Sequence, residues 1–306
     1  MTYEEFKCVV VSRIKEYLPE KYSQASISID SVLKNNGRKL ESISIRLKAL
    51  KLCPTIYLEE YYHQFQKGVQ IEDILSEIAR VRVEHEDIPD LDIRAITNWK
   101  HVRDDVRVKL INAAKNEEFL EDKPHTSVAD DLAAVYYLDF GPAPDGSAMT
   151  ITITDAIFAA YGITIEELHQ TAIENISEDG DFFCVGMIEL LLSFNLIELA
   201  SEDDAVPEKE IMYVLTNKAK TNGTGVVLCP KVMDTVAEKI GGDEEWFLLP
   251  SSIHEWLIVP NKSDFDAENL AHTVSNVNQT IEPHEVLSDV HVYIYDLKKH
   301  ELKIAI

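Results

Sequence analysis

A short polar stretch between two apolar ones carries the residue types of a nucleophilic site: Ser251, Ser252, His254 and Glu255. A serine hydrolase needs a hydroxyl within hydrogen-bond reach of an imidazole, and a third group that orients the imidazole. Asn217 could join such a group from another segment, or it could belong to a surface for a ligand or a partner. The serines lack the G-x-S-x-G motif of a nucleophile elbow. A hydrolase that uses this stretch is therefore one hypothesis for the chain.

The same residues fit the bend of a β-hairpin. The flanking runs "WFLLP" and "EWLIVP" read as strands, and serine hydroxyls often bind the amides of a turn. Both runs show little alternation of apolar and polar residues, which is typical of strands covered on both faces. The pattern favours a hairpin bend over a catalytic serine, and a polar cluster that faces a ligand stays open as a third interpretation.

No pattern in the sequence indicates a metal ion or a cofactor. The dipeptide His-Glu occurs at His85, His254, His284 and His300, and none of these extends to H-E-x-x-H. The acidic runs lack the ligand order of a calcium-binding loop. The glycine turns "NNG" and "TNGTG" do not continue as a phosphate-binding loop. We expect neither a metal nor a cofactor.

Tyrosines gather in "TIYLEEYYHQF", with Tyr61 and Tyr62 adjacent to each other. Tyrosines at a module boundary usually pack their rings and leave the hydroxyls at the rim. They are also favoured at protein interfaces. The sequence favours packing and leaves a partner surface at these residues as the alternative.

The N-terminal third begins with a helix and a hairpin. Thr2 and Glu5 form a capping box, and apolar residues then recur on one helical face until Pro19. The strand-like pieces "SISI" and "LESISIRL" are separated by a turn at Asn36-Gly37.

Two stretches of the sequence repeat one pattern. Residues 54–81 and 149–176 each read as a strand, a short helical turn that ends at a glycine (Gly68, Gly162), and a longer amphipathic helix. We interpret them as a duplication, with a weaker third copy that ends in residues 263–278.

The C-terminal third follows an acidic segment that reads as a linker. The sequence of the C-terminal third predicts strands at "IMYVLT" and "VVLC" and a helix from Pro230 that ends at Gly241. The hairpin, another helix and two closing strands follow. Tight turns between strands favour antiparallel pairing, so the fold class is α+β with packed helices in two to three repeated modules. We place the modules at residues 1–95, 96–200 and 201–306.

The charge of the chain limits its partners. Its 29 Lys and Arg stand against 54 Asp and Glu, a net charge of −25. Such a chain repels nucleic acid and anionic lipid, so we expect it to bind neither. The charge suits a basic protein partner or, as an alternative, an acidic mimic of DNA.

Several features indicate a protein of the cytoplasm. The longest apolar run, Phe182–Ile197, contains Glu189 and Asn195 and is too short to span a bilayer. The N-terminus is acidic where a signal peptide would be basic. The four cysteines stand in apolar surroundings without a C-x-x-C pair, so we expect buried, reduced thiols.

The phrases "YVLTN" and "LPSSIHE", with "VLKNNG" and "PTIYLEEYY" nearer the N-terminus, resemble an uncharacterised family of bacterial proteins found in clostridial and related gut genomes. The resemblance covers nearly the whole chain and implies no reaction. Our leading hypothesis is a soluble protein that acts through protein–protein contacts and is not an enzyme.

Overall fold

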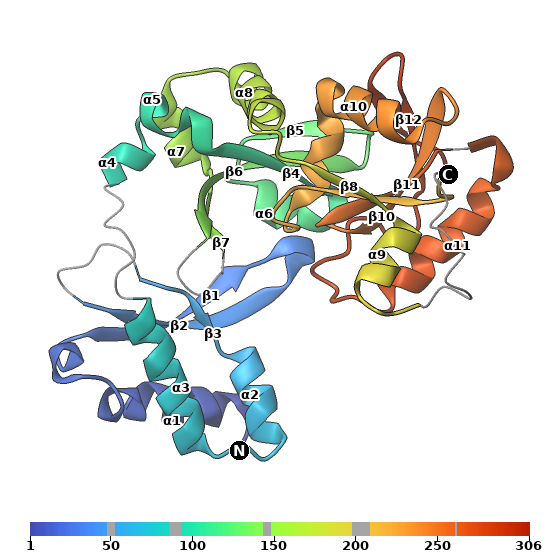
Figure 1. The fold of residues 1–306 in the computed structure, drawn as a ribbon. Coiled ribbons are helices and arrows are strands. Elements are labelled where there is room, and N and C mark those ends of the chain that lie inside the picture. Colours follow the sequence, from blue (N-terminus) through green and yellow to red (C-terminus); the bar gives the residue numbers. More distant parts are fainter. Residues whose placement is uncertain (48–52, 86–92, 143–147, 198–208, 261) are drawn as a thin grey trace. The chain divides into compact units, whose positions relative to one another are not determined.

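The computed structural model describes residues 1–47, 53–85, 93–142, 148–197, 209–260 and 262–306. Its helices and antiparallel sheets give an α+β fold, as the sequence predicts (Figure 1). The chain divides into two compact units, Met1–Ile96 and Thr97–Ile306.

The first unit is built from a small antiparallel sheet, in the order β1-β2-β3, and helices that pack on it (Figure 1). Its elements are α1 (Tyr3–Arg13), η1 (Ile14–Glu16), η2 (Glu20–Tyr22), β1 (Ser26–Leu33), η3 (Asn35–Gly37), β2 (Lys39–Arg46), β3 (Ile56–Tyr57), α2 (Glu59–Gln66), α3 (Ile71–Glu84) and α4 (Ile93–Ile96).

The start of the first unit follows the sequence prediction. The Thr2 hydroxyl accepts from the Glu5 amide, and the Glu5 carboxylate accepts from the Thr2 amide, which completes the capping box. Phe6 and Val10 are fully buried and belong to one core with Ile43 of β2. The α-helix ends at Arg13 and continues as the 3-10 turn η1, so it is shorter than predicted.

The predicted hairpin is present, and its turn uses a left-handed residue. β1 and β2 pair from Ser26↔Arg46 to Leu33↔Lys39, and Asn36 has φ 58°. Asn and Gly tolerate this region of φ, which explains why the Asn36-Gly37 pair marks the turn. The cysteine prediction needs a correction: all four thiols are free, but Cys8 is exposed, because it lies on the outer side of α1.

The second unit carries most of the strands. Its elements are α5 (Trp99–Val102), η4 (Arg103–Asp105), β4 (Val106–Asn112), η5 (Ala114–Asn116), α6 (Glu117–Leu120), β5 (His125–Val128), β6 (Leu132–Pro142), β7 (Ala148–Thr152), α7 (Asp155–Tyr161), α8 (Ile165–Glu178), β8 (Phe183–Gly186), α9 (Met187–Ser193), β9 (Tyr213–Thr216), η6 (Gly223–Leu228), α10 (Pro230–Ile240), β10 (Glu245–Ser252), β11 (Glu255–Val259), η7 (Lys262–Asp264), α11 (Ala267–Asn278), β12 (Tyr293–Asp296) and β13 (Glu301–Ile304).

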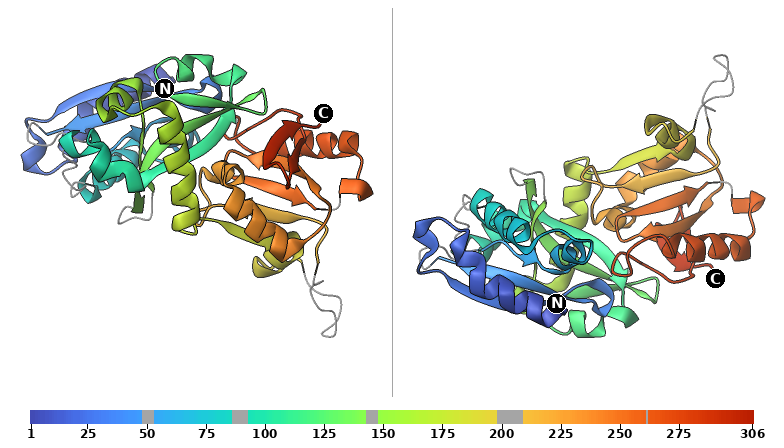
Figure 2. Two further views of the ribbon diagram at one scale, coloured as in Figure 1. Left: turned by 90° about the horizontal axis from the view of Figure 1, so that it is seen from above. Right: turned by 90° about the horizontal axis from the view of Figure 1, so that it is seen from below.

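Two antiparallel sheets organise this unit. In the first sheet the long strand β6 pairs with β4 along one edge, and with β5 and then β7 along the other. The second sheet has the order β13-β12-β10-β11-β9-β8, and its strands, coloured from yellow to red, lie next to one another in both views of Figure 2. The edge strand β8 leads directly into α9.

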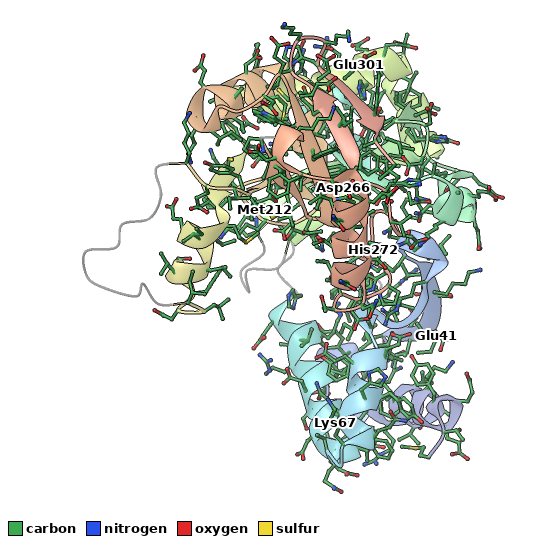
Figure 3. All side chains as sticks on the ribbon, turned by 90° about the vertical axis from the view of Figure 1, so that its right-hand side faces the viewer. Glu41, Lys67, Met212, Asp266, His272 and Glu301 are labelled. Atoms are coloured by element: carbon green, nitrogen blue, oxygen red, sulfur yellow. The ribbon has the colours of Figure 1, made fainter. Side chains whose placement is uncertain are left out.

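Helices cover both faces of the second sheet, which explains the poor alternation of its strands. Phe247 and Leu249 of β10 lie in a core with residues of α9 and α11. Trp246 and Leu248 point to the opposite face, where α10 lies (Figure 1), and all four side chains are buried. Figure 3 labels His272 on α11 and Asp266 just before the helix; the Asp266 side chain caps this helix by accepting from the Glu268 amide.

The predicted strand "VVLC" is wrong: most of it forms the end of the 3-10 helix η6. Gly225 lies so close to β4 that an added Cβ would be 2.2 Å from the Val108 carbonyl oxygen. Glycine therefore allows the turn to pack closely against the edge of the first sheet. Apolar residues alone could not separate this close-packed turn from a buried strand. The next helix, α10, starts at Pro230 and ends before Gly241, as predicted.

The two similar stretches have the same local structure. Each forms a strand, a short helix, a glycine with positive φ (98° at Gly68 and 68° at Gly162) and a helix of 14 residues. A duplication that would account for this likeness stays a prediction. A module boundary at residue 200 also stays a prediction. The strands on either side of this position, β8 and β9, pair with each other in one sheet.

Candidate functional site

The polar stretch at residues 251–255 forms the bend between β10 and β11. Ser252 lies opposite Glu255, so Ile253 and His254 form the turn. The register shifts between Pro250 and Ser252, which marks a β-bulge at Ser251. The bulge and the turn together decide where each polar side chain of the bend points.

Both serine hydroxyls are used inside the bend. Ser251 Oγ donates to Glu255 Oε1 over 2.8 Å, and Ser252 Oγ accepts from the His254 amide over 3.0 Å. Both serines are buried. These are the local hydrogen bonds by which serine stabilises turns.

The His254 ring is held by groups other than a serine. Its Nδ1 accepts from the Asn222 amide over 2.9 Å, so the neutral ring carries its proton on Nε2. That nitrogen lies 3.6 Å from Glu285 Oε1. A catalytic serine would have to bond to one of these two ring nitrogens, and neither Ser251 nor Ser252 does. The geometry of the bend therefore does not support the hydrolase hypothesis.

Asn217 lies near the bend but serves its own loop. Its side-chain amide donates to the Thr221 carbonyl over 2.8 Å, and its side-chain oxygen accepts from the Thr221 amide over 3.1 Å. The preceding residue, Thr216, reaches the bend, where its hydroxyl donates to the His254 carbonyl over 2.7 Å. Asn217 is therefore a loop-closing residue and does not converge with the serines.

Thr224, which our sequence analysis missed, joins three parts of the second unit. Its hydroxyl accepts from the Leu110 amide of β4 over 3.0 Å and lies 3.1 Å from the Ile253 carbonyl. Its own carbonyl accepts from Trp256 Nε1 over 2.9 Å. The side chain is fully buried. The glycines of "TNGTG" marked a turn in the sequence, but nothing in the pattern showed what the turn packs against.

The loop between α11 and β12 covers the other side of the bend. The Ile253 amide donates to the Glu285 carbonyl over 2.7 Å, and the next two residues of the loop, Val286 and Leu287, are buried. The bend thus lies between η6 and this loop. Its polar groups are scaffold contacts, as the hairpin interpretation expects.

A histidine–carboxylate pair that sequence reasoning also missed ties the two sheets together. Asp131 Oδ2 is 2.7 Å from His291 Nδ1 and accepts from the Tyr293 hydroxyl, also over 2.7 Å. Burial of Tyr293 and its bond to this carboxylate raise the pKa of the phenol. These residues lie about 160 positions apart in the chain, and no local pattern could have joined them.

The two predicted tyrosines pack inside the first unit. Tyr62 contacts the Tyr3 ring at 4.9 Å and the Phe6 ring at 5.4 Å, and its hydroxyl donates to the Met1 carbonyl. Tyr61 is partly buried, and this burial raises the pKa of its hydroxyl. Both rings lie against the core of α1, β2 and α3. A partner surface at these tyrosines stays a prediction.

The apolar run from Phe182 to Ile197 forms β8 and α9, and no residue of α9 is buried. Beyond the helix, Phe194 is 60% exposed and Leu196 68% exposed. Ile197 and Ile211 are also exposed. We call Phe194, Leu196, Ile197 and Ile211 the α9 surface.

The residues of the α9 surface lie next to the two ends of the helix. Ile211 is next to Met212, whose carbonyl accepts from the Met187 amide at the start of α9 (Figure 3). Phe194 and Leu196 follow its last turn. The sequence signal for this surface is the length of the apolar run, which by itself does not distinguish exposed from buried side chains.

A family model described as a family of unknown function, DUF5688, matches residues 3–297. The chain belongs to the DUF5688 family. The match includes the first unit, the bend and the α9 surface, in agreement with the resemblance of nearly the whole chain to an uncharacterised family. No curated protein and no solved structure matches the chain.

The described residues of this DUF5688 protein offer neither a metal cluster nor a membrane-spanning helix. Among the residues that the structure describes, no three His, Cys, Asp or Glu side chains come together as metal ligands would. Within the same residues, no helix is both long enough and apolar enough to cross a bilayer.

Proposed function

We propose that this protein binds a basic protein partner through the α9 surface and does not catalyse a reaction. The observation that carries the proposal is the exposure of Phe194, Leu196 and Ile211, at 60%, 68% and 64%. Monomeric proteins rarely gather large apolar side chains on their surface unless a partner covers them. Burial of such side chains would supply most of the binding free energy.

The charge of the chain supports a basic partner over a second copy. Each chain carries a net charge of −25, so two copies repel each other while a basic protein is attracted. The sequence next to the α9 surface is acidic as well, with five carboxylates and no Lys or Arg in residues 198–208. Attraction of this kind raises the rate of association and weakens with salt.

A bacterial source and a cytoplasmic location are part of the proposal. The sequence phrases that resemble clostridial proteins support the first. The free cysteines, two of them buried, support the second, because reduced thiols are usual in the cytoplasm.

Affinity capture from the native lysate tests the proposal. The wild-type chain and a Leu196→Ser variant are compared by quantitative mass spectrometry at NaCl concentrations from about 0.05 to about 0.5 M. We expect a basic protein in stoichiometric amount, at least about tenfold depleted with the variant, because about 2 kcal/mol of apolar burial is lost.

Val290→Ser is the matched control, because Val290 is also an exposed apolar residue, at 49%, and lies outside the α9 surface. It should capture the same protein as the wild type. Equal capture by Leu196→Ser, or no stoichiometric partner at any salt concentration, would contradict the proposal. Capture of an acidic protein would contradict the proposal that the partner is basic.

A further inference from the structure

The N-terminal end of α9 is held by a buried carboxylate. The N-cap residue is Gly186, which has no side chain to cap the helix. Glu210 takes this role: its two carboxylate oxygens accept from the amides of Ile188 and Glu189. Its side chain is buried, and it lies so close to Gly186 that a Cβ there would be 2.0 Å from Glu210 Oε1. The helix start is therefore anchored to the chain next to β9.

The C-terminal end of α9 is held by a Schellman motif. Asn195 has φ 55°, and its amide donates to the Leu192 carbonyl over 3.0 Å. The Leu196 amide donates to the Leu191 carbonyl, also over 3.0 Å. This pairing of bonds brings the residue after the turn back beside the helix. Leu196 is therefore held in place although it is largely exposed.

The faces of α9 differ in what they contact. Met187 and Leu190 pack against the core of the second sheet. Ile188 and Leu192, one helical turn apart, are only partly buried and lie outside that core. Glu189 and Ser193 are exposed on the polar side. Ile188 and Leu192 thus lie in a row on a helix that is fixed at both ends, and Leu196 follows the turn after its C-terminal end.

We infer that α9 is a preformed ligand helix, which enters an apolar groove lined at its rim by Lys or Arg on the basic partner. This inference rests on the proposed function and adds the mode of binding. Protruding apolar side chains at i and i+4 are the anchors of helix-in-groove recognition. Because both ends of α9 are fixed before binding, little ordering of the chain opposes association. The net charge of −25 favours a groove whose rim is basic.

Photo-crosslinking of the full-length protein in its own cells tests the mode. p-Benzoylphenylalanine replaces Ile188, Leu192 or Leu196 in separate variants, and Ser193 in a control on the polar side of the same helix. We expect crosslinks from the three apolar positions to apolar residues of one basic protein, in peptides that neighbour Lys or Arg. The Ser193 position should give at least about tenfold fewer crosslinks, because it faces away from the groove.

A second pair of positions separates the two proposals. The photo-crosslinker at Phe194 or at Ile211 detects a partner on the α9 surface but does not test whether the partner contacts the helix itself. Crosslinks to a basic protein from these two positions but not from 188 and 192 would overturn the helix-in-groove mode and leave the proposed function standing. Crosslinks only to a second copy of this chain, or none from any position, would overturn both.

Discussion

The bend at residues 251–255 and the α9 surface belong to the same unit and are opposites in chemistry. The bend has the residue types of a catalytic site, yet its serines and histidine bond to neighbouring backbone and carboxylate groups. The α9 surface has no catalytic residue type, yet its side chains are exposed although they are apolar. If the proposed function holds, exposed apolar side chains indicate a binding site better than reactive residue types do.

The polar groups of the bend have hydrogen-bond partners because two other segments pack against it. Thr224 of η6 bonds to it on one side, and the Glu285 loop bonds to it on the other. α9 has a different kind of support: bonds to its backbone hold its ends, while its outer side chains have no partner in the core. Changes at the bend should therefore alter stability, and changes at the α9 surface should alter binding.

The largest effect on stability is expected from Trp256→Ala. Trp256 is fully buried, its indole donates to the Thr224 carbonyl, and its ring meets the Tyr293 ring edge-on at 5.4 Å. We expect the free energy of unfolding of the second unit to fall by about 3–5 kcal/mol. Urea unfolding followed by the fluorescence of Trp99 and Trp246 measures it, because every tryptophan of the chain lies in this unit.

A loss below about 1 kcal/mol would mean that the bend is not part of the scaffold. Phe194→Ala is the control in the same assay. It removes an aromatic ring of similar size from a side chain that is 60% exposed and should change the free energy of unfolding by less than about 0.5 kcal/mol.

The next largest effect is expected from Glu210→Gln, which acts on α9 rather than on the bend. The amide group of glutamine keeps one acceptor and places a donor against a helix amide, which should cost about 1–3 kcal/mol. Hydrogen exchange of the Ile188 and Glu189 amides should become faster, while exchange in β10 and β11 should not change. Unchanged exchange at both amides would show that Glu210 does not hold the helix.

Smaller effects are expected from Ser251→Ala and Ser252→Ala. Each removes one hydrogen bond within the bend, which contributes about 1 kcal/mol to stability. Urea unfolding should show two similar losses. No loss in either variant would reopen the question of why two buried hydroxyls are present at this bend.

The smallest effect on stability concerns pH and a histidine outside both regions. His169 on α8 is largely buried, and this burial lowers its pKa; its Nδ1 lies 2.8 Å from the Tyr136 hydroxyl. Because the unfolded chain takes up this proton more readily than the folded chain, the contribution of His169 is complete above the unfolded pKa, near 6.5. It is lost as the pH falls below that value.

The stability of the wild type should therefore fall more steeply than that of His169→Gln when the pH is lowered from about 7 to about 5. Urea unfolding of both proteins at each pH gives the difference. A parallel decline in the two proteins would contradict the assigned role of burial at His169.

Local patterns in the sequence predicted the local parts of the fold. The capping box at Thr2, the turn at Asn36, the start of α10 at Pro230 and the bend at 251–255 depend on residues a few positions apart, and each has the predicted structure. The strand at "VVLC" failed because its conformation depends on the Val108 carbonyl, which lies more than 100 residues away in the sequence.

The α9 surface could not be predicted from the sequence for a similar reason. An apolar run such as "MIELLLSFNLI" predicts burial, and only the structure shows that Met187 and Leu190 pack against the core of the second sheet while Phe194, Leu196 and Ile197 are exposed. The pairing of Asp131 with His291 likewise depends on which strands become neighbours. Pairings between distant segments determine both features.

A binding titration of three proteins with the captured partner tests the central claim most directly. The three are the wild type, Leu196→Ser, and the double variant Ser251→Ala with Ser252→Ala. If the α9 surface binds and the bend is scaffold, Leu196→Ser weakens binding by at least about tenfold and the double variant stays within about twofold of the wild type. Loss of binding in the double variant while it remains folded, with Leu196→Ser unaffected, would contradict the account.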